Sequence, residues 1–181
     1  AVAARRSLRR SSPTPAPRSP TGALLPYPSS ALRCEVQQIS QKIHRGVHGG
    51  YSLARPPIRE TALAAAALAP RVSVDLSSTA AIEAAGVDEF RRLLERIRPQ
   101  AVFANEEEAQ LVGAIETETL VVKRGAGGVV VAGRELEARP AEVVDTTGAG
   151  DAFAAGFLLG GPELGLDAAA RCVATMGAFP P

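Results

Sequence analysis

From about residue 46 onward, short apolar stretches with strand spacing alternate with stretches that have helical spacing. Residues 71–76 alternate apolar and polar positions, which predicts a strand. Residues 87–97 place Phe90, Leu93, Leu94 and Ile97 on one stripe, which predicts a helix that Pro99 ends. Strands that alternate with helices predict an α/β fold, a mainly parallel sheet with flanking helices.

The same pattern predicts the other elements of this part of the chain. Helices are expected from the Pro56-Pro57 pair to about residue 68, after the N-capping candidates of residues 77–79, and over 105–112, 148–159 and 166–177. Strands are expected over 101–104, 119–123 and 129–132, with a further strand over 135–138. The glycine turn RGAGG joins the strands over 119–123 and 129–132.

Charge divides the chain into two parts. Residues 1–45 carry eight Lys/Arg and one acid, whereas residues 46–181 carry twelve Lys/Arg and eighteen acids. Residues 1–30 contain six prolines and five arginines, so we expect a basic Arg/Pro/Ser-rich tail over 1–45 that is disordered apart from a short helix over 31–45. An organelle transit peptide is the other interpretation of the tail. The acidic part over 46–181 argues against nucleic acid as a partner.

The chain has no apolar run of 18 residues, so no membrane partner is expected. Its two cysteines, Cys34 and Cys172, lie far apart and indicate neither a disulfide framework nor a zinc site. A reducing compartment, and hence a cytoplasmic location, is the simplest expectation. His44 and His48 have the spacing of two metal ligands on a helix, but the glycines around them argue against a helix there.

The stretch DTTGAGDAFAAGF, residues 145–157, is the strongest candidate for chemistry. A glycine-rich turn leads directly into an apolar helix, which leaves backbone N–H groups unpaired at the helix start. Such a helix start binds anions, and a carboxylate beside it, Asp151, is suited to take a proton from an attacking hydroxyl. The alternative is a capped helix in which Asp151 only favours the helix dipole.

Two other phosphate-binding motifs are absent. The chain contains no GxxxxGK[ST], and in both GxG stretches the third glycine of a dinucleotide fingerprint is replaced, by Phe153 and by Val130.

DTTGAGDAFAAGF resembles the second signature of the PfkB/ribokinase-like carbohydrate kinase family. VFANEEEAQLVG resembles the N-x-x-E segment of that family, LVVKRGAGGVVV its strand-turn-strand along the nucleotide, and ARCVATMGA its final helix. The resemblance runs from about residue 50 to residue 178. It implies a partial ribokinase-like domain over 46–181, with the nucleotide-binding part of such a kinase.

The resemblance also implies roles for individual residues. Asp151 corresponds to the catalytic base, and Gly148, Ala149 and Gly150 correspond to the anion hole for the transferring phosphoryl group. Nucleotide-binding positions are implied at Asn105, Glu108, Lys123, Gly125 and Gly128. Magnesium is implied near Glu108 through water, and a monovalent cation such as potassium at Asp145 and Thr147.

Structural interpretations stay open beside these roles. The acidic run of residues 106–108 is favoured at any helix start by the dipole. RGAGG by itself is more often a hairpin turn. Cys172 lies among small residues on a predicted helix and is expected in the core.

The implied activity is an ATP-dependent transfer of a phosphoryl group to a hydroxyl of a small sugar or sugar-like substrate, with ATP and magnesium as cofactors. A homodimer is left open. Members of the family are usually longer and begin with a substrate-binding half that carries a glycine-rich first signature and a small β-sheet lid. Neither is found here, so the alternative is a truncated, non-catalytic nucleotide-binding remnant.

Overall fold

The computed structural model describes residues 46–177, all within one compact unit of the chain. The elements are, in order, β1 (Gly46–Gly49), α2 (Gly50–Ala54), α3 (Ile58–Leu68), β2 (Val72–Asp75), α4 (Thr79–Ala85), α5 (Val87–Ile97), β3 (Ala101–Asn105), α6 (Glu106–Val112), β4 (Thr119–Lys123), a 3-10 turn (Gly125–Gly127), β5 (Val129–Val131), β6 (Arg134–Leu136), α7 (Ala149–Gly160) and α8 (Pro162–Val173). The predicted tail over 1–45, with its helix over 31–45, lies outside the described residues.

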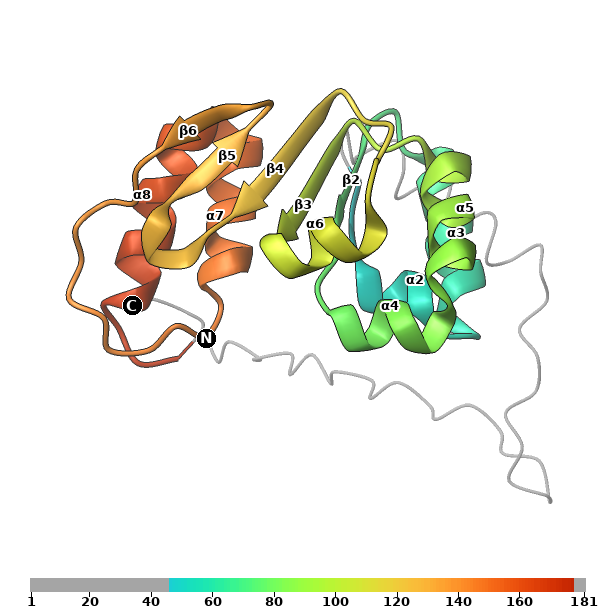
Figure 1. Cartoon of the computed structure of the whole chain (residues 1–181), viewed down its shortest axis with the longest axis horizontal. Helices are drawn as coiled ribbons and strands as arrows, with labels where there is room; N and C mark the ends of the chain where they lie inside the picture. Colours follow the sequence, from blue (N-terminus) through green and yellow to red (C-terminus); the bar gives the residue numbers. More distant parts are fainter. Residues whose placement is uncertain (1–45, 178–181) are drawn as a thin grey trace, which may run out of the picture. The chain divides into compact units, whose positions relative to one another are not determined.

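The strands form a six-stranded sheet in the order β1-β2-β3-β4-β5-β6 (Figure 1). β1 through β4 pair in parallel, with helices in the connections, as parallel strands require. β5 and β6 continue the sheet as antiparallel strands. The predicted α/β fold with a mainly parallel sheet is therefore confirmed, and its far edge is a hairpin.

Apolar residues on the two faces of the sheet belong to two core clusters. In β3, Val102 and Ala104 pack with helices α2 to α6, whereas Ala101 and Phe103 pack with α7 and α8. This division follows from the alternation of side chains along a strand. Because β3 contributes to both clusters, it joins the two helical layers.

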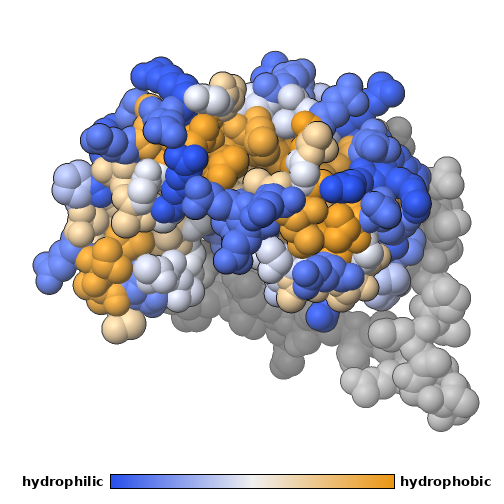
Figure 2. All heavy atoms as spheres, viewed as in Figure 1, coloured by the Kyte–Doolittle hydropathy of each residue, from blue (hydrophilic) through white to orange (hydrophobic). Residues whose placement is uncertain are grey.

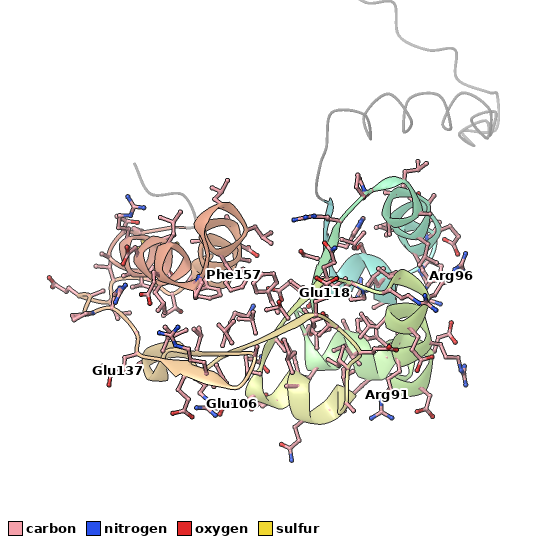
Figure 3. All side chains as sticks on the ribbon, turned by 90° about the horizontal axis from the view of Figure 1, so that it is seen from above. Arg91, Arg96, Glu106, Glu118, Glu137 and Phe157 are labelled. Carbon is pink, nitrogen blue, oxygen red and sulfur yellow. The ribbon has the colours of Figure 1, made fainter. Side chains whose placement is uncertain are left out.

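Helix α7 is attached to the sheet through aromatic contacts. The ring of Phe103 meets those of Phe153 and Phe157 edge-on, with centroids 6.3 and 5.3 Å apart. Figure 3 shows Phe157 directed from α7 toward the strands. These contacts determine where the N-terminus of α7 lies relative to the strand ends.

Most predicted elements are observed within a residue or two. The helix over 87–97 has the predicted bounds, and Ser78 caps α4 by accepting a hydrogen bond from the Ala81 amide. The predicted bounds of the last helix, 166–177, are wrong. This helix begins at Pro162, because proline suits a first helical turn, and it ends at Val173.

Residues 46–54 carried no predicted element, yet they form β1 and α2. Gly50 lies against the end of β2, where a Cβ atom would fall 2.0 Å from the Leu76 carbonyl oxygen. Gly50 is therefore explained by close packing, which the residue pattern does not show.

Polar and apolar patches alternate over the face seen in Figure 2. The most exposed large apolar side chains are those of Leu159 and Met176, at 83% and 78% exposure. None of the helices described here combines the length and apolarity that a membrane crossing requires.

Candidate active site

Three neighbouring parallel strands, β2, β3 and β4, end in polar residues: Asp75, Asn105 and Lys123. Asn105 lies opposite Lys123 in the register, and Asp75 lies opposite Phe103. All three are in phase with Phe103, so they lie on the sheet face that carries α7. The carboxyl edge of parallel strands is the usual ligand-binding edge of an α/β sheet.

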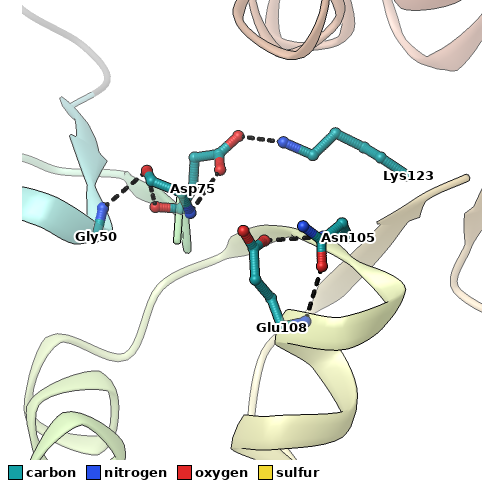
Figure 4. A network of polar contacts seen from close by, with 6 residues as sticks. Gly50, Asp75, Asn105, Glu108 and Lys123 are labelled. Atoms are coloured by element: carbon teal, nitrogen blue, oxygen red, sulfur yellow. Dashed lines mark hydrogen bonds and ion pairs between the residues drawn. The ribbon is translucent and has the colours of Figure 1, made fainter. Parts of the chain in front are cut away.

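Asp75 and Lys123 form an ion pair, with 2.6 Å between Oδ2 and Nζ (Figure 4). Their side chains are 12% and 19% exposed, so water screens the pair much less than it screens a surface pair. The pair joins β2 to β4 across β3, from which Asn105 projects on the same face.

Ser77 holds Asp75 in place. The Ser77 amide donates to Asp75 Oδ1 at 3.0 Å, and the Ser77 hydroxyl donates to the Asp75 carbonyl at 3.0 Å. The same hydroxyl accepts from the Gly50 amide at 3.1 Å. Ser77 has a φ of 67°, a left-handed conformation that is unfavourable for serine and that these hydrogen bonds stabilise.

Asn105 and Glu108 form a capping box at the start of α6. The Asn105 side chain accepts from the Glu108 amide at 2.8 Å, and Glu108 Oε2 accepts from the Asn105 amide at 2.9 Å. Glu108 is 3% exposed, and this burial raises the pKa of its carboxyl above the ordinary value, while the Asn105 amide and the charge of Lys123 act in the opposite direction. Both residues thus have a structural role that is compatible with ligand binding.

Gly148 is the N-cap of α7 and adopts a φ of 79°, which glycine tolerates. Having no side chain, it leaves the amides of the first turn without a side-chain cap. Gly150 in that turn faces Lys123: a Cβ atom on Gly150 would lie 3.4 Å from Lys123 Nζ. The ammonium group therefore lies beside the first turn of α7.

Asp151 lies in the same first turn and is exposed. Its carboxylate makes no hydrogen bond or ion pair with another residue between 46 and 177. The carboxylate is thus accessible to a molecule from solvent.

Asp145 organises the loop before α7. Its carboxylate accepts from the Thr147 amide and from the Gly177 amide, each at 2.9 Å, and these hydrogen bonds, the Thr147 bond first, hold the pKa of Asp145 below its ordinary value. The Thr147 carbonyl accepts a 3.5 Å contact from the sulfur of Cys172, which is buried as expected. The loop is thereby connected to the end of α8.

The turn RGAGG does join two strands, β4 and β5, as a hairpin. Gly128 has a φ of 83°, and a Cβ atom there would lie 2.0 Å from the Leu136 carbonyl oxygen. Gly125 also has a positive φ, 57°, but nothing lies within 4 Å of its Cβ position. Arg124 beside it pairs with Glu106 and Glu135, at 3.0 and 2.9 Å.

His48 lies on the edge strand β1 and is half-buried, while His44 lies outside the described residues. Burial lowers the pKa of His48. No group of three or more His, Cys, Asp or Glu side chains suited to a metal ion occurs within residues 46–177.

The structure brings Asn105, Lys123 and Gly150 together, with Glu108 coupled electrostatically to Lys123. It shows no hydrogen bond or ion pair, within the part described, between this group and Asp145, Gly125 or Gly128. Sequence reasoning missed Asp75. A polar residue at the end of a predicted parallel strand was the available signal, the same signal that Asn105 and Lys123 give.

The fold and this polar edge define an α/β protein with a candidate phosphate-binding site at the carboxyl ends of its parallel strands. Residues 36–179 match the model of the pfkB family of carbohydrate kinases, and the chain belongs to this family. The expected family is therefore confirmed.

A cytidine kinase from Thermococcus kodakarensis is 34% identical over an alignment of 125 residues, and the match covers 58% of this chain and 44% of that protein. A sugar kinase from Pyrococcus horikoshii, also solved with ATP, superposes with a TM-score of 0.69 at 22% identity, over 78% of this chain and 55% of that one. A fructokinase from Vibrio cholerae, solved with fructose, ADP and calcium, superposes with a TM-score of 0.55 at 25% identity. The match covers 75% of this chain and 57% of the fructokinase. The chain thus spans about half the length of these relatives.

Proposed function

We propose that this chain binds Mg-ATP and provides the nucleotide-binding and phosphoryl-transfer part of a kinase that acts on a hydroxyl of a sugar or sugar-like molecule. One observation carries the proposal: the Lys123 ammonium lies beside Gly150 in the first turn of α7, and the exposed carboxylate of Asp151 lies in the same turn. Positive charge, amides without a side-chain cap and a base are thereby grouped at one helix start.

In the proposed reaction, Asp151 takes the proton of the acceptor hydroxyl. The acceptor oxygen forms a bond to the γ-phosphorus while the bond from phosphorus to the ADP oxygen breaks. The amides of Gly148, Ala149 and Gly150 stabilise the negative charge on the transferring group. The Ala149 amide, which donates to the Thr146 carbonyl at 3.2 Å, exchanges that partner for the phosphoryl oxygen. Lys123 adds positive charge on the side of the helix where Gly150 leaves room.

Magnesium would neutralise phosphate charge in this reaction. Glu108 fits an indirect role toward it, because Oε2 already accepts the Asn105 amide, while Oε1 accepts no hydrogen bond from the described residues. Magnesium retains several waters in proteins, so contact through water suits this arrangement. We assign Asn105, Gly125 and Gly128 to the nucleotide side of the proposed site.

A monovalent cation is proposed at the loop of Asp145 and Thr147. Both Asp145 oxygens accept one backbone amide, and a carboxylate oxygen has further lone pairs for a cation. Potassium is present with ADP in one solved fructokinase of Vibrio cholerae. Such a cation would keep the loop before α7 in place.

Cytidine and fructose, which the names of two relatives contain, both carry sugar hydroxyls. We therefore propose a sugar or nucleoside hydroxyl as the acceptor. Binding of Mg-ATP without turnover is the second candidate for this chain by itself, because the chain spans only about half of its relatives.

Calorimetric titration of Mg-ATP into the 181-residue chain tests the proposal. We expect saturable binding that Gly150→Glu abolishes, since the new carboxylate would meet the Lys123 ammonium and block the turn. An acceptor panel of sugars and nucleosides then separates the two candidates: ADP release that depends on an acceptor supports the kinase, and binding without release supports the second candidate. No binding at millimolar Mg-ATP would contradict both.

A further inference from the structure

The Lys123 ammonium is held at one point, although a lysine side chain is long and flexible. Asp75 Oδ2 accepts from it at 2.6 Å, and Asp75 is itself fixed by the amide of Ser77. The carboxylate is therefore a rigid anchor, attached to the end of β2 and not to the strand that carries the lysine.

The anchored ammonium lies beside α7. A Cβ atom on Gly150 would be 3.4 Å from Nζ, which leaves the group next to the first helical turn. A lysine ammonium has three N–H donors, and Asp75 uses one of them. The other donors remain for an anion at the start of α7.

We propose that Asp75 is a positioning residue that acts through Lys123, holding the ammonium where it contacts the phosphates of the nucleotide. This inference rests on the proposed function. The carboxylate does not touch the nucleotide in this arrangement, and its effect is to fix a donor before binding, which reduces the entropy lost on binding.

Two effects of Asp75 oppose each other. Its negative charge weakens the attraction of the Asp75–Lys123 ion pair for phosphate. Its hydrogen bond, in contrast, fixes the position of the Lys123 ammonium. Another negative group that acts on Lys123, within the described residues, is the buried Glu108 on α6. A neutral residue 75 would let the ammonium turn toward Glu108 and away from Gly150, so loss of positioning outweighs the gain in net charge.

A double-mutant cycle in the full chain tests this. Mg-ATP dissociation constants are measured by calorimetry for the wild type, Asp75→Asn, Lys123→Met and the double variant, with thermal unfolding of each followed by circular dichroism. We expect Asp75→Asn to weaken binding about tenfold, as loss of a hydrogen bond to a charged group does, and to have no further effect once Lys123 is Met. Asp167→Asn, which alters the exposed ion pair between Asp167 on α8 and Arg139 in the loop after β6, is the matched control and should leave the dissociation constant unchanged.

Equal or tighter Mg-ATP binding by Asp75→Asn would overturn the inference, as would additive effects of the two substitutions. A lower melting temperature with unchanged affinity would show that Asp75 is only structural. Should Asp75→Asn fail to fold, Asp75→Glu replaces it in the cycle, because it keeps the charge and moves the carboxylate by one methylene. Absence of binding by the wild type would be a failure of the proposed function itself, seen before any variant is compared.

Discussion

Asp151 differs from the other charged residues of the candidate site because its carboxylate has no partner in the described part of the chain. Asp75, Glu108 and Asp145 are all held by backbone amides. A fixed carboxylate positions a loop or a helix, whereas an exposed one can exchange a proton with a substrate. At the scale of single residues, this contrast separates the proposed base from the acids that build the site.

Asp151→Asn should lower phosphoryl transfer by about a hundredfold or more, because it removes a general base. The Mg-ATP dissociation constant should stay within about threefold, since no hydrogen bond or ion pair within residues 46–177 is lost. Steady-state ADP release and calorimetry measure the two quantities. Asp88→Asn, an exposed acid in the first turn of α5, is the control and should alter neither. Near-normal transfer by Asp151→Asn would assign the base elsewhere.

The stability of the folded protein should depend on pH through His48, and the direction of this dependence follows from the pKa of His48. Burial holds the pKa of His48 below its ordinary value of 6.5 in the folded state. The unfolded chain therefore binds the proton more readily, and stability falls as the pH decreases through 6.5 toward the lower folded pKa.

Chemical denaturation at pH 7.5 and below 6.5 should show this loss in the wild type and a smaller loss in His48→Gln. His44 is present in both proteins, so the difference between them isolates His48. An equal loss in both would assign the pH dependence to other groups.

At the scale of elements, glycines determine how closely segments approach. Gly50 brings α2 against the end of β2, and Gly156 brings α7 against α8, where a Cβ atom would lie 2.6 Å from the Leu164 carbonyl oxygen. The sequence pattern predicted the helices and strands because their apolar spacing is local. It could not predict β1 and α2, where Gly50 is required by the distant backbone of Asp75 and Leu76.

Gly128 and Gly125 allow a matched comparison within one turn. Both have a positive φ, so alanine at either position costs about 1 kcal/mol of backbone strain. Only at Gly128 does the new Cβ atom meet backbone, and there we expect a total loss of about 3 kcal/mol. Denaturant unfolding of Gly125→Ala and Gly128→Ala measures the difference. Equal losses would show that the hairpin moves to accept the side chain.

At the scale of the whole described unit, the sheet connects two helical layers whose cores are separate. Phe90 is fully buried in the cluster with α2 to α6, and Phe103 is fully buried in the cluster with α7 and α8. Only the second cluster determines where α7 begins relative to the strand ends. The position of the proposed anion-binding turn therefore depends on packing beneath it.

Phe103→Leu and Phe90→Leu should each cost about 1 kcal/mol of stability, as swaps between large apolar residues do. Phe103→Leu should also weaken Mg-ATP binding, because it removes the edge-on contacts to Phe153 and Phe157 that hold α7. Phe90→Leu should leave the affinity unchanged. The Mg-ATP dissociation constants of the two variants are measured by calorimetry, well below the melting temperature of either variant. An equal effect of both substitutions on the affinity would contradict the link between the packing of α7 and the candidate site.

The sequence by itself determined the class of fold, the family and most of the residues of the candidate site. These depend on local patterns: apolar spacing, caps, and a glycine turn that leads into a helix. The tertiary structure alone decided that Lys123 pairs with Asp75, 48 residues away, and that Gly150 lies beside the same ammonium. Such contacts arise because parallel strands bring distant chain segments to one edge, and no spacing along the chain records which residues meet there.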